Sequence, residues 1–327
     1  MELEICGLGN ALMDVLVRLD SDETLKTLGV AKGIMHLKDE AGWQEVFQQI
    51  QHLPHETHSG GSCANVIGTA AMLGARTAFC GQVGKDHFGK LYAQTMSDNH
   101  VLSRLHLLEN GHTGKCLSLI SPDTERTMLT SLGCAIELAP EHLFTHEIQR
   151  TRMLHVTGYL FTGGRMSETA RMALEIARAH QVLISFDVSD PWVIETQRPL
   201  IWEIIEKYAD VVFTNAAEAQ VLTGKTPEEA LHELASHCKI AVVKLGSRGS
   251  LVRSGSETHG IDVYRVKAVD TTGAGDAYAG GFLYGLAKGM ELERCGRLAS
   301  RVAAETVAQT GAVVTEPGKL RHLVEGI

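Results

Sequence analysis

The segment from Asp270 to Leu283 constrains the fold and chemistry of this chain more than any other. It reads Asp-Thr-Thr-Gly-Ala-Gly-Asp-Ala-Tyr-Ala-Gly-Gly-Phe-Leu. The apolar run before it predicts a strand over residues 260–269, and the run after it predicts a helix over residues 277–287. Between them stand small residues with very little side chain, so the sequence predicts a strand, a tight turn and a helix in which the backbone is unusually accessible.

The turn at the predicted helix start has the properties of an anion cradle. Gly273, Ala274 and Gly275 let a ligand approach their N–H groups, which lack helical partners and lie at the positive end of the helix dipole. A carboxylate beside a phosphate site repels the ligand unless it has a role, and the role that fits Asp276 is to accept a proton from an attacking hydroxyl. Taken alone, the tetrapeptide Gly-Ala-Gly-Asp is equally typical of a capped helix N-terminus.

The whole segment resembles the C-terminal signature of the ribokinase-like (PfkB) carbohydrate and nucleoside kinases. The family pattern is Asp-Thr-x-Gly-Ala-Gly-Asp, followed by small residues and Gly-Gly-Phe. The chain agrees at Asp270, Thr271, Gly273, Ala274, Gly275, Asp276, Gly280, Gly281 and Phe282. The resemblance implies an ATP- and Mg²⁺-dependent kinase in which Asp276 is the catalytic base and residues 273–275 form the anion hole.

Composition excludes several other classes of function. The chain has 327 residues, 44% of them apolar and 21% charged, with a formal charge of −9. This acidic balance, without a Lys/Arg run, disfavours a nucleic-acid partner. No uninterrupted apolar run is long enough to span a membrane, and no secretory signal precedes the first predicted strand. The seven cysteines have no metal-ligand spacing, which is typical of a reduced compartment, so we expect a cytoplasmic protein.

The order of predicted elements indicates one α/β domain over residues 1–327. From about residue 150 onward, short apolar strands alternate with longer helices, as in a doubly wound, mostly parallel sheet flanked by helices. The predicted strands cover residues 153–157, 182–187, 211–214 and 240–245, and the predicted helices cover 167–180, 199–207, 216–222 and 226–237. This architecture is the ribokinase-like fold that the resemblance implies.

The N-terminal third predicts a second, smaller sheet. Residues 115–121 and 126–130 alternate around a Pro-Asp-Thr-Glu turn and predict a hairpin, while residues 15–19 and 33–37 are short strand candidates. The resemblance implies a small β lid over the substrate, inserted from about 15–40 and 113–132. The histidines around Pro54 are predicted to lie in a loop.

Asn10 and Asp14 follow the first predicted strand, where α/β sheets place their ligands. The glycines before them suggest a dinucleotide fingerprint, but Leu12 occupies its third glycine position. A turn held by an Asn and an Asp is the structural alternative. The pattern Gly-x-Gly-Asn-x-Leu-x-Asp is similar to the adenosine-kinase-like branch of the family, which implies that Asp14 and Asn10 hold the hydroxyls of a substrate sugar.

Other predicted substrate contacts rest on the same resemblance. The element Gly60-Gly61…Asn65 is similar to a Gly-Gly-x-x-x-Asn element that contacts substrate hydroxyls in the family. Gly-Gly is also a common turn signal before a helix. Leu132 and Tyr159 are apolar candidates for packing against a base. Arg126 matches an arginine that the adenosine kinases bring from the lid to the phosphates, or is an exposed hairpin residue.

Further matches imply the nucleotide and metal sites. Asn215 and Glu218 match an Asn-x-x-Glu motif that organises Mg²⁺, its waters and the phosphates, although the same pair predicts a helix capping box. The matches that imply nucleotide contacts are Gly246 and Gly249, with Lys244 where the family has Thr, together with Asp187 and Thr271. Residues 311–315 resemble a segment that holds a monovalent cation such as K⁺ with Asp270 and Thr272; from it we assign Gly311 and Thr315.

The sequence thus predicts an ATP-dependent kinase that phosphorylates the 5′-hydroxyl of a nucleoside, with adenosine as the first choice. A sugar kinase acting on ribose, fructose or a relative is the main alternative. A nucleotide-binding regulatory protein is disfavoured by the intact Asp276, and a dehydrogenase by Leu12. A monomer and a homodimer both remain open, and the expected partners are small molecules.

Overall fold

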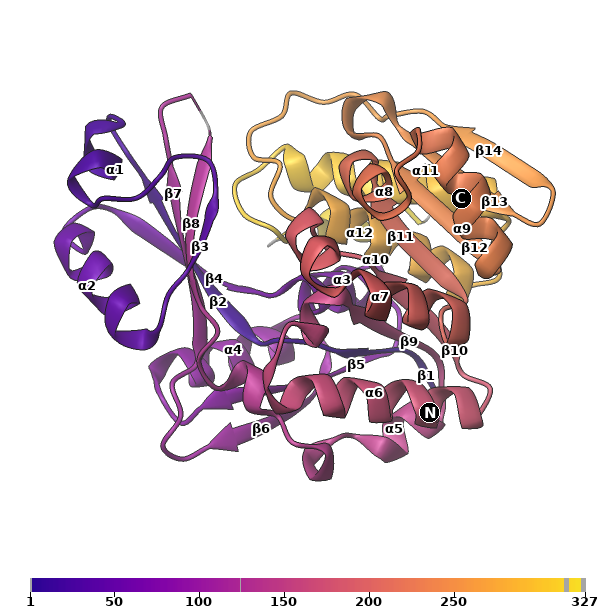
Figure 1. Cartoon of the computed structure of the whole chain (residues 1–327), viewed down its shortest axis with the longest axis horizontal. Helices are drawn as coiled ribbons and strands as arrows, with labels where there is room; N and C mark the ends of the chain where they lie inside the picture. Colours follow the sequence, from indigo (N-terminus) through magenta and orange to yellow (C-terminus); the bar gives the residue numbers. More distant parts are fainter. Residues whose placement is uncertain (1, 124, 315–317, 325–327) are drawn as a thin grey trace.

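The computed structural model describes residues 2–123, 125–314 and 318–324, and within them the main layer is a nine-stranded, mostly parallel sheet (Figure 1). The strand order is β14-β13-β12-β11-β10-β9-β1-β5-β6. Strand β13 pairs antiparallel with both of its neighbours, β12 and β14, and the other pairs are parallel. The strands are β1 (Leu3–Leu8), β5 (Thr77–Gly84), β6 (Leu102–Leu108), β9 (Thr151–Thr157), β10 (Leu183–Asp187), β11 (Val211–Asn215), β12 (Ile240–Lys244), β13 (Ser250–Ser254) and β14 (Glu257–Ile261). The predicted fold class is confirmed.

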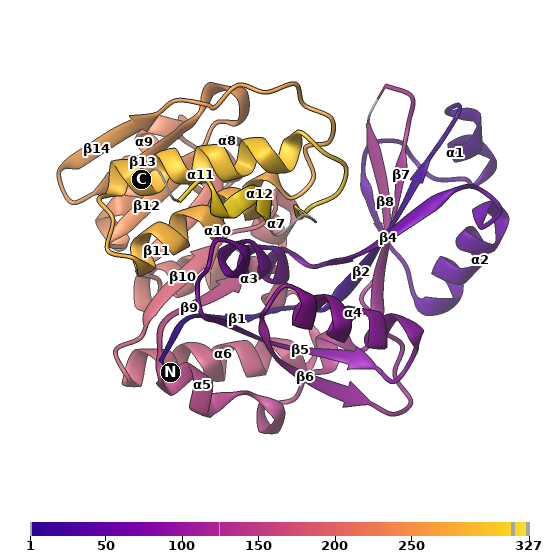
Figure 2. The ribbon, with the colours of Figure 1, turned by 180° about the vertical axis from the view of Figure 1, so that it is seen from behind.

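Helices cover both faces of this sheet, which is why its central strands are apolar along their length. One face, seen in front in Figure 2, carries α3 (Ser62–Met72), α4 (His87–Asp98), α10 (Ala274–Ala287), α11 (Leu292–Val307) and α12 (Gly318–Arg321). The opposite face, in front in Figure 1, carries α5 (Thr145–Gln149), α6 (Gly164–Ala179), α7 (Pro191–Lys207), α8 (Ala216–Thr223) and α9 (Pro227–His237). The predicted helices over 167–180, 216–222 and 226–237 are confirmed. The predicted helix over 199–207 is the second part of α7, which begins at Pro191 and is kinked at the non-helical Gln197.

Two apolar cores hold these layers together. The first lies between the sheet and α3, α10 and α11, around fully buried side chains such as Ile67, Phe282 and Leu298. The second lies under α6, α7 and α9, around Leu174, Ile204 and Leu234. Because α10 packs against both α3 and α11, these two helices determine where its N-terminus lies.

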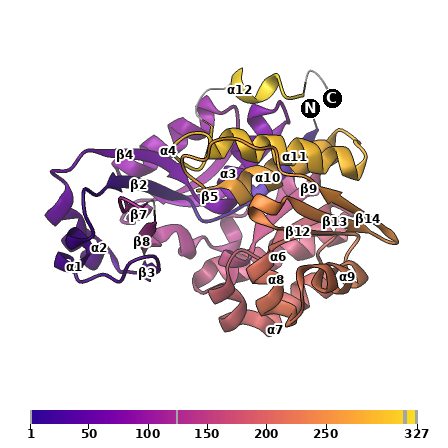
Figure 3. The same cartoon turned by 90° about the horizontal axis from the view of Figure 1, so that it is seen from above.

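A second sheet of five strands stands beside the main layer (Figures 1 and 3). Its order is β3-β8-β7-β2-β4, with β2 (Leu12–Arg18), β3 (Met35–Leu37), β4 (His55–Gly60), β7 (Gly114–Ile120) and β8 (Arg126–Ser131). Helices α1 (Glu23–Thr27) and α2 (Glu40–Ile50) cover its outer side, where Trp43 and Leu117 are buried in a third core. The predicted hairpin is β7–β8; that the second sheet acts as a lid stays a prediction.

Two local predictions are wrong. The strand expected over residues 260–269 ends at Ile261, and the chain from Asp262 to Asp270 is irregular. Strand β14 is an edge strand, and after it Tyr264 N–H donates to Ser300 Oγ of α11 rather than to another strand. The loop expected around the histidines after Pro54 is strand β4, which pairs with β2 although its residues are mostly polar.

Among the described residues, no helix combines the length and apolarity needed to cross a membrane.

Candidate active site

The N-terminus of α10 forms the predicted cradle. The helix begins at Ala274, and its N-cap Gly273 has φ of 68°, a backbone conformation that favours glycine. A Cβ at Gly273 would lie 2.3 Å from the carbonyl oxygen of Ala312, so the turn also needs glycine because the C-terminal segment packs against it. Gly273, Ala274 and Gly275 therefore present their backbone toward the adjoining space without side chains in the way.

Asp276 lies in the first turn of α10, and two side chains of the α3 segment hold its carboxylate. Ser62 Oγ donates to Oδ1 at 2.7 Å, and Asn65 Nδ2 donates to Oδ2 at 2.9 Å. Burial raises the pKa of Asp276 to about 6, against the effect of these two donors. A carboxylate with this pKa is ionised at neutral pH and is a better proton acceptor than an exposed aspartate.

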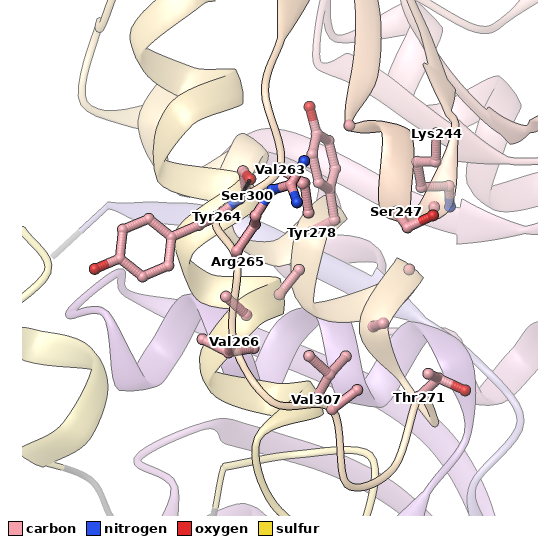
Figure 4. Close-up of a pocket in the computed structure, with 17 residues that line it drawn as sticks. Lys244, Ser247, Val263, Tyr264, Arg265, Val266, Thr271, Tyr278, Ser300 and Val307 are labelled. Carbon is pink, nitrogen blue, oxygen red and sulfur yellow. Dashed lines mark hydrogen bonds between the residues drawn. The ribbon is translucent and has the colours of Figure 1, made fainter.

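Two cavities open on either side of this turn. The first, of about 660 Å³, lies between the irregular chain after β14, α10 and α11 (Figure 4). Its walls are largely apolar, with Val266, Val307 and the ring of Tyr278, and Arg265 lies beside that ring. Among the residues that line it are the predicted nucleotide contacts Gly246, Gly249 and Thr271, and Ala274 and Gly275 of the cradle.

The second cavity, of about 550 Å³, lies between the main sheet and the second sheet. It contains Asp276 and most of the predicted substrate and phosphate contacts, which come from strand ends and helix starts far apart in the sequence. They are Asn10, Asp14, Gly61, Asn65, Leu132, Tyr159, Asp187, Asn215, Glu218, Gly246, Thr272, Gly273 and Gly275.

The two cavities share Lys244, Gly246 and Gly275, so they meet at the start of α10. Asp276 lines the second cavity, directly beyond that junction. A group with a phosphate chain in the first cavity would therefore reach a hydroxyl in the second at the position of the anion cradle and the carboxylate. Transfer of a phosphoryl group requires that donor and acceptor meet in this way.

The second cavity has a polar end next to Asp276. The Oδ1 atom of Asn10 is buried and has no hydrogen-bond partner among the described residues, which points to a ligand donor. Burial raises the pKa of Asp14 to about 6, although the charges of Arg126 and His58 oppose the rise. Gly60 packs against this carboxylate, since a Cβ there would lie 2.3 Å from Asp14 Oδ2.

The second cavity also has apolar and aromatic walls. Strands of the second sheet contribute Leu12, Met35, Leu37 and Met128, and the main layer contributes Tyr159 and Trp192. The side chains of Leu37 and Trp192 are strongly exposed, at 57% and 44%. Large apolar groups that face a cavity while exposed are typical of a surface that a ligand covers.

Arg126 joins the second sheet to the α10 turn. Its Nη1 donates to Thr272 Oγ1, and its Nη2 donates to Ser118 Oγ at 2.9 Å. Thr272 in turn donates to Asp270 Oδ1, and the Gly311 N–H donates to Asp270 Oδ2 at 3.0 Å. The residues predicted for a monovalent cation are thus adjacent, except for Thr315, which lies outside the described residues. Their role in cation binding stays a prediction.

Asn215 and Glu218 form the capping box that the sequence offered as the alternative interpretation. Asn215 Oδ1 accepts from the Glu218 N–H at 2.9 Å, and Glu218 Oε2 accepts from the Asn215 N–H at 2.7 Å. Glu218 also faces the second cavity, and burial raises its pKa to about 7, partly opposed by Lys244.

The described residues contain no group of three or more His, Cys, Asp or Glu side chains arranged to hold a metal ion. Mg²⁺ keeps several waters and takes only one or two protein carboxylates besides the phosphates. Asp187 and Glu218 supply such oxygens at the junction.

Several residues of this site were not predicted as functional, among them Lys244, Ser62 and Trp192. Lys244 was noted only as a departure from the family pattern, yet its Nζ lies at the junction, 2.9 Å from Asp187 Oδ2. Ser62 could have been found from its place between Gly61 and Asn65. Trp192 follows the predicted strand end at Asp187, which was the available signal for it.

Comparison with solved structures supports the same fold over the full chain. The chain is 30% identical to an adenosine kinase from Sinorhizobium meliloti and 29% identical to a probable sugar kinase from Rhizobium etli CFN 42. Each of these matches has a TM-score of 0.92 and covers 100% of this chain and 99% of the other. An Anopheles gambiae adenosine kinase in complex with P1,P4-di(adenosine-5) tetraphosphate is 25% identical, with a TM-score of 0.84, over 95% of this chain and 97% of the other.

Curated relatives are named as sugar kinases. An uncharacterized sugar kinase from Archaeoglobus fulgidus is 29% identical over 248 residues, 74% of this chain and 95% of the relative. The 5-dehydro-2-deoxygluconokinase 2 of Bacillus cereus is 27% identical over 266 residues, 76% of this chain and 80% of the relative. Residues 48–318 match the pfkB family carbohydrate kinases. With its phosphoryl-transfer geometry, the chain therefore belongs to this family of ATP-dependent kinases that act on a hydroxyl group.

Proposed function

We propose that this kinase phosphorylates the 5′-hydroxyl of a nucleoside, and that the nucleoside is adenosine. The observation that carries the proposal is the lining of the second cavity, from here on the acceptor cavity, which combines polar groups at Asn10 and Asp14 with apolar ones at Leu37, Tyr159 and Trp192. A nucleoside has the same combination, because its ribose is polar and its base is flat and largely apolar. A free sugar would leave the apolar side chains in contact with water.

The remaining residues then have consistent roles. ATP occupies the first cavity with its phosphates toward the junction, and residues 273–276 face the transferring group. Asp276 takes the proton of the hydroxyl, while the N–H groups of the cradle and Arg126 stabilise the negative charge that develops. Asp187, Asn215 and Glu218 would hold Mg²⁺ through its waters, and the ion would supply charge neutralisation on the phosphates.

We further propose that the second sheet is the lid of this site. Met35 and Leu37 of β3 belong to the acceptor cavity and are exposed, so movement of this sheet toward Trp192 would bury apolar surface over the base. Exclusion of water matters here because water competes with the hydroxyl as a phosphoryl acceptor.

The likeness to the Sinorhizobium adenosine kinase supports a nucleoside acceptor. The curated relatives named 5-dehydro-2-deoxygluconokinase instead favour a second candidate, a kinase of a small sugar or sugar acid. For such a substrate Asn10, Asp14 and Asn65 would provide the hydroxyl contacts. The apolar side chains of the cavity would then contact no part of the substrate.

A coupled assay of ADP release across a panel of acceptors tests the proposal. The panel holds adenosine, guanosine, inosine, ribose, fructose and 5-dehydro-2-deoxygluconate, each with Mg²⁺ and with or without K⁺. We expect adenosine to give the highest kcat/KM, with the sugars lower by at least about 100-fold, or about 2.7 kcal/mol. A sugar that equals adenosine would move the protein to the sugar-kinase branch. A rate that rises with K⁺ would support the cation site at Asp270.

A further inference from the structure

Lys244 ends strand β12 at the junction of the two cavities. Its side chain is 14% exposed, and Nζ lies 2.9 Å from Asp187 Oδ2. A Cβ built on Gly275 would lie 3.2 Å from Nζ, so the ammonium group lies against the backbone of the anion cradle. Lys244 is also one of the residues that line both cavities.

A lysine side chain is a cation at neutral pH, and the buried ammonium group of Lys244 is paired with the carboxylate of Asp187. The carboxylate of Glu218 also acts on this charge. Together with Asp276, three carboxylates therefore surround one buried lysine at the point where a polyphosphate must enter. A fixed cation at that point reduces the repulsion that a phosphate chain would meet.

We propose that Lys244 is a catalytic residue that contacts the transferring phosphoryl group. The ammonium group lies where the first cavity, the proposed donor cavity, meets the acceptor cavity, beside Gly275 of the anion cradle. Lysine binds phosphate as a point charge on a flexible stem. The threonine that the family signature has at this position offers a hydroxyl but no charge.

This inference rests on the proposed phosphoryl transfer. In that step the acceptor oxygen bonds to the γ-phosphorus as Asp276 takes its proton. The bond from that phosphorus to the β,γ-bridging oxygen breaks, and the electron pair leaves with ADP. Lys244 gains and loses no proton; it shifts from Asp187 toward the phosphoryl oxygens and stabilises them.

A structural role predicts different measurements. If Lys244 only neutralises Asp187, its loss leaves a buried carboxylate without a partner, which lowers stability but does not discriminate among nucleotides. If it contacts the transferring group, its loss weakens ligands that carry a γ-phosphate far more than ADP. Binding therefore separates the two roles even when no acceptor is present.

The test is calorimetric titration of wild type and Lys244→Met with Mg²⁺ complexes of β,γ-methylene-ATP and of ADP. We expect the Kd of the triphosphate analogue to rise at least about tenfold and that of ADP to change less than about threefold, on the scale of one charged contact. The kcat with the best acceptor of the panel should fall by about 10²–10³-fold. Lys244→Arg, which keeps the charge, should retain the analogue's affinity within about threefold.

Two further variants control for damage to the fold. Lys115 is also a buried, ion-paired lysine, with Nζ 2.6 Å from Glu40 Oε1, but it lines neither cavity, so Lys115→Met should leave the analogue's Kd unchanged. Asp187→Asn/Lys244→Met removes both charges of the ion pair and serves in the titration should the single variant fail to fold. It should recover stability without recovering the analogue's affinity.

The proposal is overturned if Lys244→Met binds the triphosphate analogue as wild type does, if ADP loses as much affinity as the analogue, or if the double variant restores the analogue's affinity. The binding result does not depend on the acceptor. A kinase that proves inactive on every nucleoside and sugar would thus refute the proposed function while the titration still decided the role of Lys244.

Discussion

The first cavity, the proposed donor site, and the second, the proposed acceptor site, are built in different ways. The residues that line the donor cavity all lie between Lys244 and Val307, in α10, α11 and the chain that leads to them from the end of β12. The acceptor cavity draws on residues from Asn10 to Ala312 and on both sheets. The donor cavity is thus lined by one limited stretch of the sequence, whereas the acceptor cavity is assembled from many separate strand ends. We infer that substitutions on the acceptor side can change the substrate without altering the transfer chemistry.

Substitution at the junction should affect the reaction most. Asp276→Asn keeps the shape of the side chain but accepts a proton poorly, so kcat should fall by about 10²–10⁴-fold with little change in the Kd of ATP. Steady-state kinetics and nucleotide titration measure the two effects separately. A variant that keeps more than half of wild-type turnover would show that another group accepts the proton.

A change confined to the acceptor side should separate the two cavities. Asp14→Ala leaves the substrate hydroxyls without a charged partner, at a cost of about 2–4 kcal/mol. The KM of the nucleoside should therefore rise by about 30- to 1,000-fold while the KM of ATP stays within about threefold. Equal changes in both KM values would mean that Asp14 supports the whole site rather than the acceptor.

The pH dependence of kcat should report the titration of Asp276. Because burial raises the pKa of Asp276 to about 6, its base form is lost as the pH falls below that value. The kcat should then decrease by about tenfold per pH unit below about 6 and stay constant from pH 7 to 8. An acidic limb centred near pH 4, the ordinary value for an aspartate, would contradict this environment.

The smallest expected effect is on stability. A carboxyl whose pKa is raised in the folded protein destabilises that protein above this pKa, and the cost disappears below the pKa of the unfolded chain. Water in the cavity screens the buried charge and so reduces this cost. Asp276→Asn should therefore raise the free energy of unfolding by about 1 kcal/mol at pH 8 and by less at pH 5. Denaturant unfolding at both pH values measures this, and a loss of stability at pH 8 would count against it.

The sequence predicts the turn at the start of α10 and the main sheet because their signals are local. The glycines at 273 and 275, the adjacent Asp276 and the apolar strands of the main sheet each show their pattern within a few residues. The mostly polar β4 was not predicted, because it is stabilised by pairing with β2 rather than by its own pattern. The run after Ile261 has valines typical of a strand, but beyond the sheet edge it lines a cavity instead.

The acceptor side was predicted only in part. Asn10, Asp14 and Asn65 follow recognisable turns, whereas Met35, Leu37 and Trp192 face the cavity only through the packing of the second sheet beside the main layer. The role of Lys244 depends on its distance from Gly275, which is far away in the sequence. Such juxtapositions are properties of the tertiary structure and carry no local signal.

A ligand that spans both cavities tests whether they meet at one transfer point. P1,P4-di(adenosine-5) tetraphosphate carries an adenosine at each end, and the Anopheles adenosine kinase forms a complex with it. For this protein we expect one molecule bound per chain, with inhibition competitive against ATP and also against adenosine. Lys244→Met should weaken this binding more than it weakens that of ADP. Inhibition competitive against ATP alone, with adenosine still able to bind, would contradict the account.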